Sequence, residues 1–239
     1  MVSKTQPVNA ALPAVFHVMR FRLQKDGPLQ YISHLDFVRT MTKILVRSKL
    51  PLWYTQGFNP IPKITFAAPL SVGMESDCEL MDVRLCEEVE PSKAKEQLSR
   101  VLPPHLVALD AYTPKSKLSE IGFLCYDIRM TYDGICQAHA EEANAFLASP
   151  SIIIQKKGKS GVRDLDLRPM MHKTTLTYCA ERQEIVGEWI LSAAPEAFLN
   201  PELLVTTLRE HTPLLPKDRD VWYGLRRREV LSPDLSIFH

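Results

Sequence analysis

Residues 27–70, GPLQYISHLDFVRTMTKILVRSKLPLWYTQGFNPIPKITFAAPL, contain a helix start, an amphipathic helix and a turn-rich segment in succession. Ser33, followed three residues later by Asp36, is an acidic variant of the capping box, so we expect a helix to begin there. Apolar residues then recur at helical spacing and predict the buried side of this helix: Leu35, Val38, Met41, Ile44 and Leu45. Pro51 ends the helix and leads into the turn-rich segment.

Strand patterns lie on both sides of this helix. Apolar and polar residues alternate in the second half of residues 14–23, and further strands are expected at residues 63–70, 78–85 and 107–112. Pro91 suits the first turn of a second helix, which continues through residues 92–102. The resulting order, strand–helix–strand–strand–helix–strand, is that of the ferredoxin-like unit.

The second half of the chain repeats this order. We expect strands at residues 123–131, 151–155, 174–180, 185–192 and 221–227, and helices at residues 138–147 and 201–210. The sequence therefore predicts an α+β fold of two tandem ferredoxin-like units, with antiparallel sheets and helices packed on one face. The units are expected to cover residues 14–114 and 122–239, after a flexible tail of residues 1–13.

Composition limits the classes of partner and the compartment. The chain has 239 residues, 45% hydrophobic and 24% charged, with a formal net charge of +1. It can bury a sizeable core, but only local patches could attract nucleic acid or an acidic membrane. Its five cysteines are odd in number and lack a C-x-x-C pair, which favours reduced, cytoplasmic thiols over disulfides, zinc or an iron–sulfur centre. No long apolar segment indicates a signal peptide or a membrane span.

His34 lies at the first helical position, beside Ser33 and Asp36. A histidine there could act as a general acid or base, or contact a phosphate at the helix N-terminus. It could equally support the helix cap, because a lone histidine is more often structural. Both roles remain open from the residues.

Residues 56–63, QGFNPIPK, form a candidate binding loop. Gly57 permits a backbone conformation closed to other residues, and two prolines stiffen the loop. Such a loop could present polar, aromatic and basic side chains to single-stranded nucleic acid, or simply connect two strands. The candidate RNA-binding residues in and around it are Arg39, Lys43, Tyr54, Gln56, Phe58, Asn59 and Lys63.

A second basic segment follows residue 155. Its candidate phosphate-binding residues are Lys156, Lys157, Lys159, Arg163 and Arg168. The spacing of a P-loop is absent, so we expect a flexible loop touching phosphates or a solvated hairpin tip. The run of arginines at residues 226–228 could add to this charge or lie on a solvated edge strand.

Several chemistries have no motif in this sequence. There is no G-x-S-x-G, no H-E-x-x-H, no G-x-G-x-x-G after a strand and no dense aspartate cluster. We therefore expect no metal and no cofactor, and a binding role rather than an independent enzyme.

Residues 27–83 closely resemble the N-terminal signature of an uncharacterised bacterial family, the radical-SAM-linked proteins, described as a domain of unknown function. The signature reads G-x-L-x-[FY]-x-S-H-L-D-x-x-R, then L-P-x-x-Y-[ST]-Q-G-F-N-P-x-P-[KR]-[IL]-x-[FA], and this sequence meets its fixed positions. It departs at Ile61, where many members have histidine or arginine. A second marker, V-x-D-L-D-L-R-P, matches residues 162–169, so the resemblance spans about residues 16–228.

The resemblance implies that this protein functions together with a radical S-adenosylmethionine protein, because family members are encoded next to such proteins or fused to them. Their genes often lie near ribosomal-protein and ribonuclease genes. Our leading hypothesis is an accessory protein that binds RNA during rRNA or tRNA processing or modification. Arg39, Lys43 and Lys63 would contact phosphates, and Phe58 or Tyr54 would stack on bases. The alternatives are an RNA-processing or RNA-modifying enzyme that uses His34, and a protein-interaction module without nucleic acid.

Overall fold

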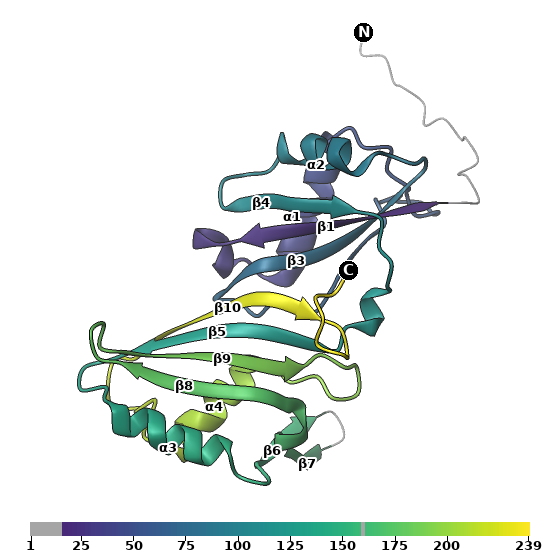
Figure 1. Ribbon diagram of the computed structural model, residues 1–239. Coiled ribbons are helices and arrows are strands. Elements are labelled where there is room, and N and C mark those ends of the chain that lie inside the picture. Colours follow the sequence, from purple (N-terminus) through teal and green to yellow (C-terminus); the bar gives the residue numbers. More distant parts are fainter. Residues whose placement is uncertain (1–15, 159–160) are drawn as a thin grey trace.

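The computed structural model describes residues 16–158 and 161–239. Within these residues the chain forms a mixed α+β fold with an eight-stranded, mostly antiparallel sheet, a two-stranded ribbon and four α-helices (Figure 1). The expected tail of residues 1–13 lies outside the described residues.

The first half of the chain forms four strands of the sheet and two α-helices. In order, its elements are β1 (His17–Lys25), the 3₁₀ turn η1 (Gly27–Tyr31), α1 (His34–Arg47), β2 (Ile64–Phe66), β3 (Met74–Leu85), α2 (Pro91–Ser99) and β4 (Leu106–Tyr112). The strands lie in the order β4-β1-β3-β2, and every neighbouring pair is antiparallel.

The second half contributes the other four strands and the ribbon. Its elements are η2 (Leu118–Glu120), β5 (Phe123–Thr131), α3 (Gln137–Leu147), β6 (Ile153–Gly158), β7 (Gly161–Asp166), η3 (Arg168–Met170), β8 (Met171–Cys179), β9 (Glu184–Ser192), α4 (Pro201–His211) and β10 (Trp222–Leu231). The strand order is β10-β5-β9-β8, again with antiparallel neighbours. Strands β6 and β7 pair only with each other.

The two halves share one sheet through a parallel pairing of β3 with β10, which places Met74 opposite Leu225 and Ser76 opposite Arg227. Strand β2 pairs with residues 81–83 of β3, so the start of β3 remains available to β10. Strand β10 is consequently interior, paired with β3 on one side and β5 on the other. The expectation that residues 226–228 lie on an edge strand is therefore wrong.

Apolar side chains form two clusters, one for each half. Met19, Phe21 and Leu23 of β1 pack with α1 and α2, whereas β5, β8 and β9 pack with α3 and α4. Because side chains alternate along a strand, the intervening residues of β1 and β5 lie on the opposite face of the sheet, away from the helices. Strand β3 contributes to both clusters: its residues 81, 83 and 85 belong to the first, and 74, 78 and 80 to the second.

Helix α1 begins as its capping residues predict. Ser33 Oγ accepts a hydrogen bond from the Asp36 backbone N–H at 3.2 Å and donates one to the Asp36 carboxylate at 2.8 Å. The buried side differs from the prediction, since Leu35 is 58% exposed and Phe37 is buried instead. Two residues correspond to about 200° around a helix, so a helix that turns Phe37 and Met41 toward the sheet turns Leu35 outward.

Two further segments, one expected as a strand and one as a loop, differ from expectation. The strand expected at residues 63–70 is shortened to Ile64–Phe66, because the chain takes a positive φ of 36° at Ala68. The polar loop expected after residue 155 continues instead as the β6–β7 ribbon, in which Lys156 pairs with Arg163.

Candidate nucleic-acid interface

The start of α1 is positioned by Gly27 and His105. Gly27 has a φ of +54°, and the His105 ring lies so close that an added Cβ would come within 2.6 Å of it. Asp26 Oδ1 lies 2.9 Å from His105 Nδ1, and the Gly27 N–H donates to Glu75 at 3.0 Å. This turn therefore needs glycine, and it ties the segment before α1 to both β3 and β4.

His34, the first residue of α1, makes an aromatic contact with Phe66. Its ring lies edge-on to Phe66, with ring centroids 5.9 Å apart and an interplanar angle of 86°. Within residues 16–158 and 161–239, no hydrogen bond joins this ring to a carboxylate or a hydroxyl. The contact joins the helix start to β2, and it provides no partner for proton transfer.

The exposed side of α1 carries Arg39 and Lys43. Arg39 donates to Asp36 at 3.1 Å, with both side chains more than half exposed. Lys43 is exposed beside Thr40, Val46 and Arg47, and it pairs with no carboxylate among the residues that the structure describes. This side of α1 faces away from the sheet, so its free positive charge comes from Lys43 and Arg47.

Residues 55–61, called here the 55–61 loop, are closed at their base. The Thr55 N–H donates to the Ile61 carbonyl at 2.9 Å, and the Ile61 N–H donates to Thr55 Oγ1 at 3.2 Å. Gly57 adopts a φ of +143°, as expected for a residue chosen for conformational freedom. The loop is therefore closed by the hydrogen bonds between Thr55 and Ile61, independently of the side chains at its tip.

Phe58 lies at the tip of this loop and is fully exposed, with a relative accessibility of 105%. Gln56 and Asn59 are exposed beside it. Tyr54, in contrast, is half-buried against the first apolar cluster. Of the two aromatic residues expected to stack on bases, only Phe58 has its ring open to solvent.

Lys63 extends from the foot of the loop to the helix-free face of the sheet. Its carbonyl accepts from the Arg84 N–H at 3.1 Å, so Lys63 lies beside Arg84 at the end of the β2–β3 pairing. They line a pocket of about 220 Å³ together with Lys117; its other lining residues are Val18, Thr65, Asp82, Leu118 and Ser119. We call it the basic pocket. Since α1 covers the other face, Lys63 and Lys43 do not share one surface.

The carboxylate in the basic pocket is already paired. Asp82 accepts two hydrogen bonds from the fully buried guanidinium of Arg20, at 2.6 and 2.9 Å. Arg84 stacks on Phe16 at 3.9 Å and lies 5.6 Å from the Trp53 ring. The sequence did not predict roles for Arg84 and Lys117, because they come from segments far from residue 63.

The β6–β7 ribbon carries the second predicted group of basic residues. Lys156 and Arg163 are exposed and lie opposite each other on one face of the ribbon. Lys157 pairs through its backbone with Val162, and Lys159 lies outside the described residues. The Arg168 side chain turns back to the Met171 carbonyl at 3.1 Å.

The ribbon lies at the opposite end of the molecule from the first half, as Figure 1 shows. The structure thus does not bring the two predicted basic groups together.

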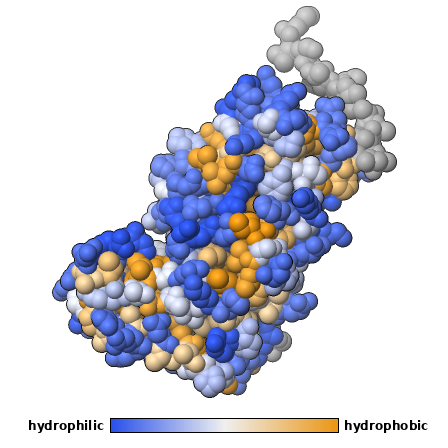
Figure 2. Space-filling view, viewed as in Figure 1, coloured by the Kyte–Doolittle hydropathy of each residue, from blue (hydrophilic) through white to orange (hydrophobic). Residues whose placement is uncertain are grey.

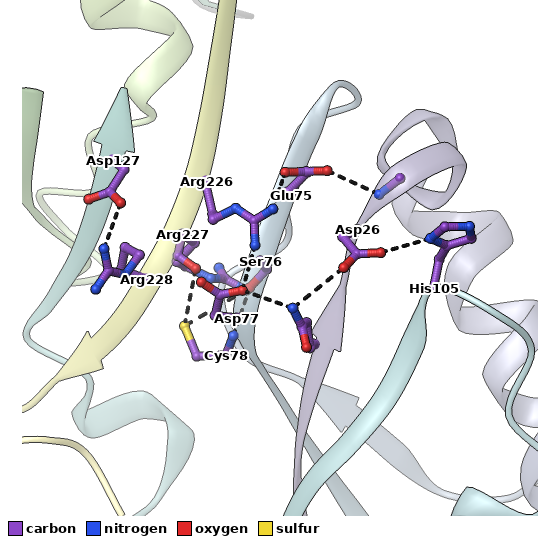
Figure 3. Close-up of polar contacts among 12 residues, drawn as sticks. Asp26, Glu75, Ser76, Asp77, Cys78, His105, Asp127, Arg226, Arg227 and Arg228 are labelled. Carbon is purple, nitrogen blue, oxygen red and sulfur yellow. Dashed lines mark hydrogen bonds and ion pairs between the residues drawn. The ribbon is translucent and has the colours of Figure 1, made fainter. Parts of the chain in front are cut away.

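A third polar region, which the sequence did not predict, crosses the middle of the helix-free face (Figure 3). Arg226 of β10 donates to Glu75 at 2.5 Å and to Asp77 at 2.8 Å, and Arg228 donates to Asp127 at 2.7 Å. Figure 2 shows hydrophilic side chains gathered across this waist of the molecule. A pocket of about 410 Å³ lies beside these pairs. Two acidic and two basic side chains line it, so its positive and negative charges are equal in number. We call this region the central seam.

A buried ion pair lies behind the central seam. Arg227 pairs with Glu79, and both side chains are almost fully buried. Arg227 also donates to the Ala68 carbonyl at 2.6 Å. Lys25 is 3% exposed nearby; burial lowers the pKa of its ammonium, and the charge of Glu79 opposes that shift. Burial likewise raises the pKa of the neighbouring Cys78 thiol to about 11.

Neither a metal-binding cluster nor a membrane-spanning helix occurs in the described parts of the chain. They contain no cluster of three or more histidine, cysteine or acidic side chains that could hold a metal ion. No helix among them is long and apolar enough to cross a membrane.

Comparisons with known proteins give a family and a fold. No curated protein matches the sequence significantly. Among solved structures, a chain in the crystal structure of a Cbf5–Nop10–Gar1 complex is similar, with a TM-score of 0.50 and 12% identity over 89% of this chain and 48% of that chain. The present chain thus spans about half of that relative, and the likeness concerns the fold alone. A family profile matches residues 19–201, and the chain therefore belongs to the family described as an uncharacterized protein conserved in bacteria (DUF2344).

Proposed function

We propose that this protein binds single-stranded RNA, and that it does so as an accessory to a radical S-adenosylmethionine protein in the processing or modification of rRNA or tRNA. One observation carries the RNA-binding part: a fully exposed phenylalanine at the tip of a hydrogen-bonded loop. Exposing a large apolar ring costs free energy in water, and stacking on an unpaired base recovers it.

The residues around Phe58 suit recognition of a base. Gln56 and Asn59 each carry an amide that both donates and accepts, so they can pair with the edge of a stacked base. Lys63 at the foot of the loop supplies a positive charge for the backbone phosphate. Separate, additional phosphate contacts in this proposal are Arg39, Lys43 and the second basic group, Lys156, Lys157, Lys159, Arg163 and Arg168.

We also propose that the fold consists of two tandem ferredoxin-like units, residues 14–114 and 122–239. The strand orders β4-β1-β3-β2 and β10-β5-β9-β8, each with antiparallel neighbours and two helices, support this description. The ribbon of β6 and β7 is then an insertion in the second unit.

The proposals of a radical S-adenosylmethionine partner and of a cytoplasmic location depend on other observations. The resemblance of residues 27–83 to radical-SAM-linked proteins supports the partner, and the exposed side of α1 offers Leu35 and Val46 for a protein contact. All five cysteines are unpaired, which supports a reducing cytoplasm. Purification of the tagged protein from cells, with and without ribonuclease, separates an RNA-mediated partner from a direct one.

Titration of a labelled single-stranded oligonucleotide tests RNA binding directly. We expect affinity at low salt that falls as the salt concentration rises, since neutralised phosphates release counterions. Indifference to RNA at low salt, together with a partner that survives ribonuclease, would favour a protein-interaction module without nucleic acid.

An enzyme that uses His34 remains the alternative. The edge-on contact between His34 and Phe66 favours a structural role, worth about 0.5–1.5 kcal/mol for an aromatic pair. We expect His34→Phe to keep the stability of the wild type and His34→Ala to be less stable by about 0.5–1.5 kcal/mol, with no change in any RNA turnover. Loss of turnover in both variants, at full RNA affinity, would instead assign His34 to acid–base chemistry.

A further inference from the structure

We infer that the basic pocket formed by Lys63, Arg84 and Lys117 is a phosphate-binding site. If the protein binds RNA as proposed above, this site holds a backbone phosphate next to the nucleotide that stacks on Phe58. The inference adds Arg84 and Lys117 to the candidate site, and neither belongs to the loop that carries Phe58.

The charges in the pocket are unbalanced. Three cations line it, and its one carboxylate, Asp82, is bound by the buried guanidinium of Arg20. In the described ranges, neither Lys63 nor Lys117 comes within ion-pair distance of an acidic group. The central seam is different, because its arginines are each paired with a carboxylate. Excess positive charge in a concave site attracts an anion.

The groups that line the pocket are held in place from behind. The guanidinium carbon of Arg84 lies 3.9 Å from the centre of the Phe16 ring, and this cation–π contact restrains the side chain beside the pocket. Arg20 donates to the Ser116 carbonyl at 2.9 Å and so fastens the residue before Lys117 to the sheet. The Arg84 guanidinium and the backbone next to Lys117 are thus held by the framework before a ligand arrives.

The size and chemistry of the pocket fit a phosphate group. Its volume of about 220 Å³ equals that of about seven water molecules at roughly 30 Å³ each, enough for a hydrated phosphoryl group. Thr65 and Ser119 add hydroxyl groups, which donate hydrogen bonds to phosphate oxygens.

The position of the pocket connects it to Phe58. Lys63 follows Phe58 by five residues, so the two α-carbons are at most about 18 Å apart even in a fully extended chain. Closure of the loop between Thr55 and Ile61 makes the separation shorter still. One RNA strand can therefore reach both the ring and the pocket.

Lys117→Gln is the informative variant, with Lys115→Gln as its matched control. Lys117 lies in the pocket and outside the loop, whereas Lys115 is equally exposed but is not a lining residue. The affinity for a single-stranded oligonucleotide should fall with rising salt concentration. We expect Lys117→Gln to make the slope of log affinity against log salt concentration less steep by about 0.7, which corresponds to the loss of one phosphate contact. Lys115→Gln should leave the slope unchanged.

Free pyrophosphate provides a second, RNA-independent measurement. We expect its ³¹P resonance to broaden with the wild type and to remain sharp with Lys117→Gln. If the protein binds pyrophosphate but not RNA, the pocket is a phosphate-binding site and the proposed RNA-binding function is wrong. If the protein binds RNA but Lys117→Gln alters neither the salt dependence nor the ³¹P signal, the pocket is not a phosphate-binding site. The proposed RNA-binding function would then still stand.

Discussion

At the scale of single residues, Phe58 and Glu79 occupy opposite environments, and each environment predicts what substitution will do. Phe58 is fully exposed at the tip of the 55–61 loop, so its ring adds little to folding. Glu79 is 2% exposed and neutralises the buried guanidinium of Arg227, with Lys25 buried beside them. Substitution of the first should alter binding, and substitution of the second should alter stability.

Phe58→Ala should weaken binding of a single-stranded RNA by roughly 5- to 150-fold, because stacking contributes about 1–3 kcal/mol per base. The melting temperature should stay unchanged, and Phe58→Trp should retain the affinity. Ile61→Ala, a change at an exposed apolar residue of the same loop, is the control. Equal losses for Phe58→Ala and Ile61→Ala in fluorescence anisotropy would contradict a stacking role.

Glu79→Gln should lower the free energy of unfolding by about 3–5 kcal/mol, since it leaves Arg227 buried without a counter-charge. Replacing both partners by Leu and Met should recover most of the loss, as apolar groups need no counter-charge. Arg226→Gln is the comparison, because Arg226 is 35% exposed and exposed pairs contribute about 0–1 kcal/mol. Urea unfolding measures all three, and a double variant as unstable as Glu79→Gln would refute this account.

At the scale of secondary-structure elements, the β6–β7 ribbon is held at its base by Asp166. The Asp166 carboxylate accepts from the backbone N–H groups of Ile152 and Arg168, at 2.8 and 3.0 Å, and from the Ser151 hydroxyl at 2.9 Å. These hydrogen bonds, the Ile152 and Arg168 N–H groups first, lower the pKa of Asp166 below its ordinary value.

Asp166→Ala should release the base of the ribbon and speed hydrogen exchange at the amides of Ile152 and Arg168. Because the pKa of Asp166 is lowered by folding, its contribution is present above the ordinary aspartate pKa and is lost as the pH falls below about 4. The wild type should therefore approach the exchange rates of the variant in acid. Asp164→Ala, at an exposed carboxylate of the same ribbon, should change neither rate.

Several elements follow from local residues and others do not. Ser33 predicted the start of α1, and alternation predicted β5 with the bounds that the structure has, Phe123–Thr131. The sequence left a flexible loop and a hairpin as alternatives for the ribbon, because charged residues dominate this segment and few apolar residues, such as Ile154 and Leu165, mark its strands. The buried side of α1 also needed the sheet, which selects Phe37 over Leu35.

At the scale of the whole molecule, β3 joins the two halves. It buries Met81 in the first apolar cluster and Cys78 in the second, and its first residues pair with β10. Separation of the halves would expose both the apolar residues of β3 and the buried charge of Arg227. The two proposed units should therefore depend on each other for stability.

We expect the full chain to unfold in one cooperative transition, with equal calorimetric and van't Hoff enthalpies. A fragment of residues 14–114, which lacks β10, should fail to fold or should aggregate. Two resolved transitions in scanning calorimetry, together with a folded fragment, would show instead that the units are independent.

The sequence by itself determined the local features: the cap and the start of α1, the strand at residues 123–131, and a stiff loop that carries Phe58. Each depends on residues a few positions apart, whose spacing reports helical or strand periodicity. Only the tertiary structure decided the pairing of β3 with β10, the burial of Arg227 against Glu79, and the meeting of Lys63, Arg84 and Lys117. Those contacts join distant segments, so the free energy that selects them comes from burial and charge pairing in the assembled sheet.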